Sequence, residues 1–315
     1  MTGIELIELL NRSYRRWHLT GDMENGVIAA LDLEGRLFTI INGQVINRVL
    51  PSAIEKRSNK NAYQNPGGDA LWPAPEGTTL GYEYPTGHWR VPPSITGAVW
   101  EVVSAEENKT VLRTEIDLIN NQQTGLPCEF ERHIKIETKK NVLIQNVTEL
   151  IRYVGKKTIN NGEFMLAPWS LCQFDSDERG KVVIPVSDEE NVWDLYSSSG
   201  QQRFIKDNQL IVNTKTDQRF QLGLSEKVDW IEYFAGDEFR VKRSVLNSVP
   251  THRYIDIADD SPDKTPSAKG VKLSVYCDPS GFMEIEGCGR CPDMLTTDME
   301  MSVDILTEYV VTEYK

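Results

Sequence analysis

The chain begins with apolar side chains at helical spacing. Positions three or four residues apart would lie on one face of a helix and pack against the rest of the protein. Thr2 followed by Glu5 also gives the capping-box pattern that starts many helices. The sequence therefore predicts an accessory helix over residues 2–17, within the first 20 residues. Its apolar face would be formed by Ile4, Ile7, Leu10, Tyr14 and Trp17.

From residue 26 onward the apolar period changes to two, which is the period of a β-strand. Residues 130–136, for example, place Phe130, Ile134 and Ile136 on one face. Asn42-Gly43 lies between two such runs and predicts a tight hairpin, because both central residues of a type I′ turn have positive φ. Many short strands with almost no helix after residue 17 predict a large all-β protein with antiparallel sheets. The predicted strands lie at 27–31, 37–41, 44–49, 98–103, 109–119, 128–137, 141–149, 157–159, 163–174, 181–185, 203–205, 209–212, 220–224, 228–234, 239–245, 271–277, 281–287 and 299–311.

Residues 51–97 interrupt this pattern and are rich in Pro, Gly and Asn. We expect a long irregular excursion here, centred on residues 65–77 (Asn-Pro-Gly-Gly-Asp-Ala-Leu-Trp-Pro-Ala-Pro-Glu-Gly). Its prolines would stiffen the loop and its glycines would let a ligand approach the backbone. Asp69 and Glu76 could then bind sugar hydroxyls while Trp72 stacks on the apolar face of the ring. The alternative is a surface turn in which Trp72 packs on the core and the two acids satisfy their own loop.

Charge and length narrow the classes of partner. The chain has 315 residues and a formal net charge of −13, which argues against binding to nucleic acid or to an anionic membrane surface. No stretch of 18 apolar residues predicts a membrane-spanning helix. No Gly/Ser-rich or Pro-rich linker divides the sequence, so we expect one domain over residues 1–315. The oligomeric state is left open.

The five cysteines are an odd number for an oxidised framework and are sparse for this length. We expect them to be mostly reduced and buried, which favours a cytoplasmic location over a secreted or periplasmic mature form. Cys288 and Cys291 have the C-x-x-C spacing, but a redox motif of this kind usually opens a helix. Neither a metal site nor a cofactor is expected, since no phosphate-binding or dinucleotide fingerprint is present.

Three segments resemble galactose mutarotase-like proteins. Residues 66–76 are similar to the Gly-Gly-x-x-Leu-Trp-x-Ala-Pro-Glu pattern of uncharacterised members of that superfamily. Residues 166–171 (Leu-Ala-Pro-Trp-Ser-Leu) follow a pair of adjacent strands, and residues 282–286 (Phe-Met-Glu-Ile-Glu) resemble a late Glu-Leu-Glu strand. The resemblance spans about residues 25–311. It implies an antiparallel β-supersandwich in an aldose 1-epimerase-like branch of unknown function.

The resemblance also implies a chemistry. Mutarotases of this superfamily use a late-strand glutamate as base and histidines as acids, so that a sugar ring opens and recloses on its other face. Glu284 or Glu286 resembles that base, and both lie on one face of their strand because they are two residues apart. Trp169 stands where a mutarotase carries a catalytic histidine. This difference leaves a different acid, a different sugar or simple binding as alternatives.

His88 is the candidate acid that remains in the irregular segment. Its neighbours Trp89 and Arg90 could line the same cleft, with Arg90 binding a carboxylate if the sugar is acidic. The alternative is a structural or exposed loop histidine. Trp169 could offer a stacking surface.

The predicted function is therefore recognition of a sugar or oligosaccharide in a cleft of a β-sheet, with aldose 1-epimerase-like acid/base chemistry at Glu284 or Glu286. The alternative is a non-catalytic carbohydrate-binding protein. A third class, glycoside hydrolysis or lysis, would need two carboxylates on either side of the scissile bond, for example Asp69 and Glu286.

Overall fold

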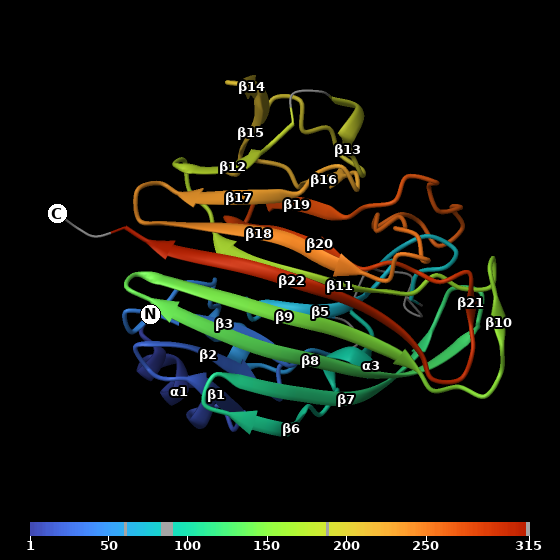
Figure 1. Ribbon diagram of the computed structural model, residues 1–315, viewed down its shortest axis with the longest axis horizontal. Coiled ribbons are helices and arrows are strands. Elements are labelled where there is room, and N and C mark those ends of the chain that lie inside the picture. Colours follow the sequence, from blue (N-terminus) through green and yellow to red (C-terminus); the bar gives the residue numbers. More distant parts are fainter. Residues whose placement is uncertain (60–61, 83–90, 187–188, 313–315) are drawn as a thin grey trace.

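The computed structural model describes residues 1–59, 62–82, 91–186 and 189–312 (Figure 1). Two large antiparallel sheets dominate it, as the period of two predicts. The first has the order β1-β2-β3-β5-β11-β20-β19-β16-β13, with β4 paired to β3. Its strands are β1 (Trp17–Gly21), β2 (Asn25–Ala30), β3 (Arg36–Ile41), β4 (Gln44–Val45), β5 (Asp69–Ala74), β11 (Ala167–Asp175), β13 (Val192–Asp194), β16 (Phe220–Leu224), β19 (Leu273–Asp278) and β20 (Phe282–Cys288).

The second sheet has the order β14-β15-β12-β17-β18-β22-β9-β8-β7-β6. Its longest strands run side by side across the front of Figure 1. Buried and more exposed residues alternate along them, so one face of this sheet packs on the core. Its strands are β6 (Glu101–Glu106), β7 (Lys109–Ile119), β8 (Gly125–Lys139), β9 (Val142–Tyr153), β12 (Gly180–Ile184), β14 (Arg203–Lys206), β15 (Gln209–Asn213), β17 (Trp230–Ala235), β18 (Phe239–Ser248) and β22 (Met299–Val311).

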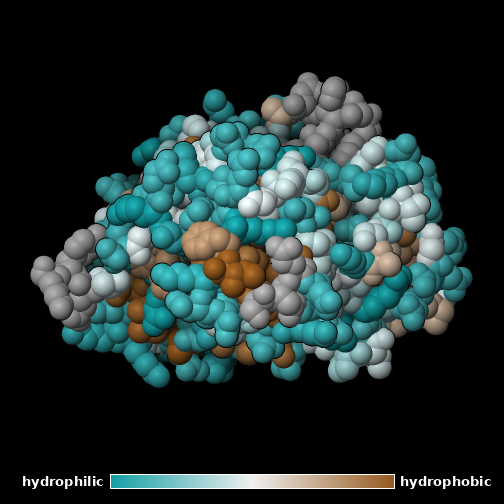
Figure 2. All heavy atoms as spheres, turned by 90° about the horizontal axis from the view of Figure 1, so that it is seen from above, coloured by the Kyte–Doolittle hydropathy of each residue, from teal (hydrophilic) through white to brown (hydrophobic). Residues whose placement is uncertain are grey.

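The remaining elements are short. They are the helices α1 (Gly3–Arg12), α2 (Pro51–Glu55) and α3 (Pro93–Thr96), the 3₁₀ turn η1 (Glu189–Asn191), and the two-stranded pair β10 (Ile159–Asn160) and β21 (Met294–Leu295). The face of the molecule in Figure 2 is largely hydrophilic, with small hydrophobic areas. Among the described residues, no helix is long and apolar enough to cross a membrane.

The predicted N-terminal helix is present but shorter than expected. Thr2 is its N-cap, and the capping box with Glu5 is formed in both directions. The helix ends at Arg12, and Tyr14 has a positive φ of 55° that turns the chain away. Trp17, predicted on the helix, instead begins β1.

The predicted apolar face is wrong in part: Leu6, Leu9 and Leu10 form the buried face of α1, whereas Ile4 and Tyr14 are exposed. This buried face packs with β2, β3 and α2 over one part of the outer face of the first sheet.

The Asn42-Gly43 hairpin is confirmed, since both residues have positive φ (51° and 73°) between β3 and β4. The prediction of one irregular excursion over residues 51–97 is wrong at its centre. Residues 69–74 form β5, a fully buried strand paired with β11. Pro73 lies directly opposite Pro168 in this pairing, so the two residues without an N–H group face each other.

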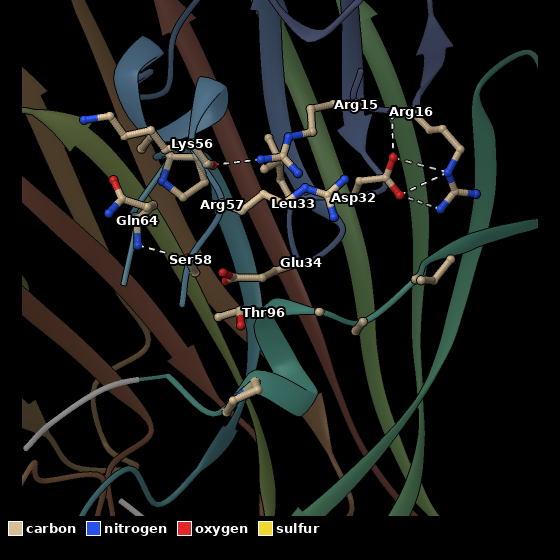
Figure 3. A pocket seen from close by; sticks show the side chains of 16 residues that line it. Arg15, Arg16, Asp32, Leu33, Glu34, Lys56, Arg57, Ser58, Gln64 and Thr96 are labelled. Carbon is tan, nitrogen blue, oxygen red and sulfur yellow. Dashed lines mark hydrogen bonds and ion pairs between the residues drawn. The ribbon is translucent and has the colours of Figure 1, made fainter. Parts of the chain in front are cut away.

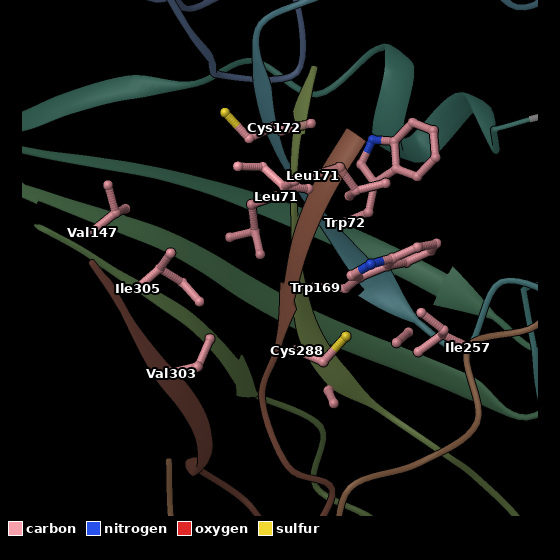
Figure 4. Close-up of a cluster of buried hydrophobic side chains, with 14 of the residues drawn as sticks. Leu71, Trp72, Val147, Trp169, Leu171, Cys172, Ile257, Cys288, Val303 and Ile305 are labelled. Carbon is pink, nitrogen blue, oxygen red and sulfur yellow. The ribbon is translucent and has the colours of Figure 1, made fainter. Parts of the chain in front are cut away.

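The alternation along each strand of the first sheet separates two environments. One set of side chains points between the two sheets, where Leu71, Ile305 and Val147 belong to the main hydrophobic core (Figure 4). Asp69 also points between the sheets, because its carboxylate pairs with arginines of β8 and β18. Trp72, three residues further on, points to the outer face. This outer face, beyond the part that α1 covers, carries the cavity described next.

Candidate functional site

A cavity of about 270 Å³ lies on the outer face of the first sheet. Strands β5, β11, β20, β19 and β16 form its floor, and the segments around residues 63–65 and 259 form part of its walls. Aromatic rings, carboxyl groups and one guanidinium make up most of the lining. The lining residues are Tyr63, Asn65, Trp72, Glu76, Trp169, Leu171, Tyr196, Arg219, Gln221, Asp259, Tyr276, Asp278, Phe282, Glu284 and Glu286.

Glu284 and Glu286 lie together at the floor of this cavity. Both project from the same face of β20, as residues two apart on a strand must. In the antiparallel register, Tyr276 of β19 stands opposite Glu284, and Ser274 stands opposite Glu286. On the other side, Gln173 of β11 stands opposite Glu284. The sheet therefore surrounds each carboxyl group with side chains of both neighbouring strands.

The hydrogen bonds around the two carboxyl groups are unequal. Glu286 accepts from the Trp169 indole N–H (3.0 Å) and from the Gln221 amide, whose nitrogen lies 2.9 Å from Oε2. Glu284 accepts from the Gln173 amide at 2.6 Å. The two carboxyl groups also lie close enough to affect each other, so the charge of Glu286 disfavours ionisation of Glu284. Glu286, with donors from Trp169 and Gln221, is the better stabilised anion of the pair.

Burial raises the pKa values of both acids, and the charge of Glu286 adds to the effect on Glu284. Glu286 is fully buried and Glu284 is 7% exposed. Burial raises the pKa of Glu284 well above its usual range, and the charge of Glu286 raises it further. Burial also raises the pKa of Glu286, to about 7, against the opposing effect of its hydrogen-bond donors. Two acids this close titrate as an interacting pair, with ionisation favoured at Glu286.

This pair should make the stability of the protein depend on pH. Both folded-state pKa values are raised above the unfolded value of 4.5, so the contribution to stability is present below pH 4.5 and is lost as pH rises through 7. We expect Glu284→Gln to reduce this loss, because it removes one buried acid and the repulsion on the other. Urea unfolding at pH 5 and pH 8 measures this loss of stability. The free energy of unfolding should change by about 1.4 kcal/mol per pH unit for each proton released.

The exposed Glu115 of β7, which lies outside the cavity, provides the control. Glu115→Gln should keep the wild-type pH dependence. If the free energy of unfolding depends on pH equally in the Glu284→Gln variant and the wild type, the two acids do not interact as described.

The aromatic walls are held rigidly. Trp72 and Trp169 face each other across β5 and β11 and pack edge to face, with ring centroids 6.2 Å apart (Figure 4). The Trp72 indole N–H donates to Glu34 at 3.0 Å, and Tyr63 packs edge to face on Trp72 at 5.8 Å. Both indole nitrogens are therefore engaged with protein carboxylates. Trp72 is 5% exposed and Trp169 is 1% exposed, so only a small part of each ring is left to contact a ligand with apolar C–H groups.

Electrostatically the cavity is acidic. Five carboxyl groups line it and Arg219 is the single cation among the described lining residues. Arg219 pairs with Asp259 at 2.9 Å and lies over the Tyr196 ring at 4.8 Å, so its charge is already balanced. Burial raises the pKa of Tyr196 and Tyr276, which therefore remain neutral hydrogen-bond donors at neutral pH. The site favours neutral or cationic ligands over anions.

The structure separates the residues that the sequence singles out. Trp72, Glu76 and Trp169 line the cavity with Glu284 and Glu286. Asp69 does not: it lies on the other face of β5, where its carboxylate pairs with Arg132 at 2.9 Å and with Arg243 at 2.8 Å. The predicted sugar-binding role for Asp69 conflicts with this position, because both of its oxygens are occupied between the sheets. His88, Trp89 and Arg90 lie outside the described residues.

Several lining residues escape sequence reasoning. Arg219 lies just before β16 and Gln221 lies within it. Asp259 comes from the long polar loop at residues 256–269. Only Tyr276 could have been found from the sequence. It stands in a predicted strand, two residues before Asp278, so the two side chains share a face, as Glu284 and Glu286 do. The others meet only because non-consecutive strands pair in the first sheet.

The cysteines behave as predicted. All five are free and buried. Burial raises the pKa of the Cys291 thiol to about 11 and that of Cys288 well above its usual range. Thiols of this kind are poor nucleophiles at neutral pH. Among the described residues, no three His, Cys, Asp or Glu side chains are grouped as metal ligands.

Comparison with solved structures shows what the fold is similar to. A galactose mutarotase-like protein from Clostridium acetobutylicum has 11% identity and a TM-score of 0.52, covering 95% of this chain and 98% of that one. A galactose mutarotase-like protein from Lactobacillus casei has 9% identity and a TM-score of 0.53, covering 93% and 100%. A galactose mutarotase related enzyme from Lactobacillus acidophilus has 10% identity and a TM-score of 0.50, covering 95% and 99%.

At such identities the likeness concerns the fold, and it confirms the supersandwich that the sequence motifs imply. No curated protein sequence matches the chain. A family of unknown function, DUF6786, matches residues 7–231, which is more than half of the sequence. The chain therefore belongs to the DUF6786 family of unknown function and has a galactose mutarotase-like fold.

Proposed function

We propose that the cavity binds a neutral sugar and that Glu284 and Glu286 interconvert its anomers. The observation that supports this most is the buried pair of Glu284 and Glu286 beside aromatic rings, because burial favours the protonated form of Glu284 while hydrogen-bond donors stabilise the anion of Glu286. A protonated and an ionised carboxyl group side by side supply an acid and a base at the same pH. The fold is also that of galactose mutarotase-like proteins.

The reaction follows from the inequality of the two acids. Glu286, the better stabilised anion, takes the proton of the anomeric hydroxyl while protonated Glu284 gives its proton to the ring oxygen. The bond between the anomeric carbon and the ring oxygen breaks, leaving an open-chain aldehyde. Both oxygens are bonded to the same carbon, so two adjacent carboxyl groups can reach them together. After rotation about the neighbouring carbon–carbon bond, the reverse proton transfers close the ring on its other face.

The size and charge of the cavity define the substrate class. A volume of about 270 Å³ lies just below the usual range of about 300–1,000 Å³ for ligand pockets, which suits a single sugar ring better than a polymer. The lining acids would repel sugar acids and sugar phosphates. Carboxylates and the Gln221 and Asn65 amides can bind hydroxyl groups, and the Trp72 and Trp169 rings can contact the C–H face.

The alternative function is binding without catalysis. It is favoured by one observation: the described lining residues include no histidine that could act as the acid. Glycoside hydrolysis has less support. Glu284 and Glu286 project from one face of the same strand, whereas hydrolysis needs two carboxyl groups on either side of the scissile bond. Asp69, the other acid considered for hydrolysis, faces the opposite side of the sheet from Glu286.

Proton NMR of freshly dissolved α-anomers tests the proposal. We expect the wild type to accelerate anomeric equilibration of at least one neutral aldose, and a Glu284→Gln/Glu286→Gln double variant to lose the acceleration. The chemical shifts of the sugar, read at equilibrium, also report binding.

Two results would count against catalysis. Saturable sugar binding without faster equilibration would favour the non-catalytic alternative. Acceleration that survives in the double variant would place the chemistry elsewhere in the protein. Glu115→Gln is the control for both measurements and should behave as the wild type.

A further inference from the structure

A second cavity of about 500 Å³ lies beside the first sheet, separate from the sugar cavity (Figure 3). It is bounded by the end of α1, α2 with the segment that follows it, and α3. Four cationic side chains line it, Arg15, Arg16, Lys56 and Arg57, against two acidic ones. This is a local excess of positive charge in a chain whose formal net charge is −13.

Both acids in the lining already have cationic partners. Asp32 forms a two-pronged ion pair with Arg16, with the closest atoms 2.6 Å apart, and also accepts from the Arg16 backbone. Glu34 pairs with Arg36, which is fully buried behind it. Both carboxylates are thus engaged by other arginines, and only the charge of Asp32 also acts on Arg15, whose pKa it raises against the effect of burial.

Arg15 is the unusual member of the group. It is 7% exposed, and its guanidinium donates only to backbone carbonyls, those of Ile54 at 3.1 Å and Lys56 at 2.7 Å. Within the described part of the chain, no carboxylate pairs with it. Arg57 is exposed and likewise lacks a described carboxylate partner, and Figure 3 shows the two guanidinium groups near each other. Burial and the charge of Arg57 both lower the pKa of Arg15, which shows that the two like charges interact.

Two buried or crowded cations without a counter-ion are costly unless an anion joins them. Guanidinium groups bind phosphate and carboxylate oxygens in pairs. We propose that this second cavity binds a compact oxyanion, a phosphoryl or carboxylate group, between Arg15 and Arg57. The Thr96 hydroxyl and the Gln64 amide, on opposite walls, can supply neutral hydrogen bonds.

The two cavities lie back to back. Residues 63–66 separate them: Tyr63 and Asn65 line the sugar cavity, whereas Gln64 and Pro66 line the cationic one. The opposite charges of the two linings make their ligands distinguishable. The cationic cavity should select anions, which the acidic sugar cavity repels.

Isothermal titration calorimetry at constant ionic strength tests the site, with inorganic phosphate, glucose 6-phosphate and galacturonate as probes and chloride as the reference. We expect saturable binding of at least one probe. If inorganic phosphate binds as tightly as glucose 6-phosphate, the free ion is the ligand. If glucose 6-phosphate or galacturonate binds more tightly, the site recognises an anionic group carried by a sugar.

Arg57→Gln should weaken this binding about tenfold, because it removes a charge at the site. Lys56→Gln should have little effect, because the Lys56 ammonium points away from the two arginines (Figure 3). Both side chains are exposed, so the fold should be unaffected. Lys206→Gln removes one exposed positive charge from β14, far from this cavity, and should bind as the wild type. If anion binding is weakened equally in all three variants, the effect follows from the net charge of the protein and the proposal is overturned. The lack of saturable binding for every probe at concentrations where chloride has no effect would overturn it as well.

Discussion

Glu286→Gln is expected to lower the rate of anomeric equilibration by about 10²-fold or more, which is the usual contribution of a general acid or base. Glutamine keeps the shape of the side chain and its hydrogen bonds with Trp169 and Gln221 need only a rotation of the amide. What it removes is the basic carboxylate. Sugar binding should change much less than the rate, because a neutral amide can still bond a hydroxyl group. NMR exchange measurements over a range of sugar concentrations separate the two effects.

The pH dependence of the wild type gives a second test of the same site. Catalysis requires one proton on the pair, with Glu284 protonated and Glu286 ionised. The rate should rise as pH increases through the lower of the two apparent pKa values and fall as it passes the higher one, giving a bell around neutral pH. Glu286→Gln should lose the bell together with the activity.

Glu115→Gln should keep both the rate and the bell. A Glu286→Gln variant that binds sugar and retains more than about a tenth of the wild-type rate would show that Glu286 is not the base. Activity would then have to rest on another group, and Glu284→Gln, measured in the same way, would show whether the pair takes part at all.

The fold and the carboxyl pair were accessible from the sequence because they depend on local periodicity. A period of two marks strands wherever they pair, and it also places Glu284 and Glu286 on one face of β20 whatever lies opposite. The same argument cannot say that Gln221 and Trp169 will surround them. Those contacts depend on which strands become neighbours, and β20 lies between β11 and β19 in a sheet of non-consecutive strands.

Residues 65–77 show where local reasoning fails. Their glycines and prolines indicate a loop, and Asp69 in a buried strand contradicts its usual preference. The strand forms because partners more than sixty residues away neutralise Asp69, namely Arg132 and Arg243. The same long-range pairing turns Asp69 away from the sugar cavity while leaving Trp72 in its lining. The segment therefore brings Trp72 to the cavity and places Asp69 on the opposite face of β5, while the contact of Trp72 with a sugar stays a prediction.

The ion pairs of Asp69 are expected to be the largest single electrostatic contribution to stability. Asp69 bonds Arg132 and Arg243, and Glu149 completes the group with Arg132 at 2.6 Å and with the Ser170 hydroxyl at 3.0 Å. Every member is buried between the sheets. Burial alone would raise the pKa of Asp69, but the guanidinium groups of Arg243 and Arg132 lower it to about 2. The stabilisation by Asp69 is thus present above its unfolded pKa of 3.8 and is lost as pH falls through 2.

Asp69→Asn should therefore reduce the free energy of unfolding by about 3–5 kcal/mol at pH 7, because it leaves two buried guanidinium groups short of one negative charge. Asp177→Asn is the matched control: Asp177 pairs with Arg179 at 2.6 Å, but both side chains are more than half exposed, and the expected loss is below about 1 kcal/mol. Urea unfolding at pH 7 compares the two. Equal losses would contradict the assignment of Asp69 to the core. Sugar binding that disappears in Asp69→Asn while the protein remains folded would instead restore Asp69 to the site, whereas unchanged binding separates its role in stability from the chemistry at Glu284 and Glu286.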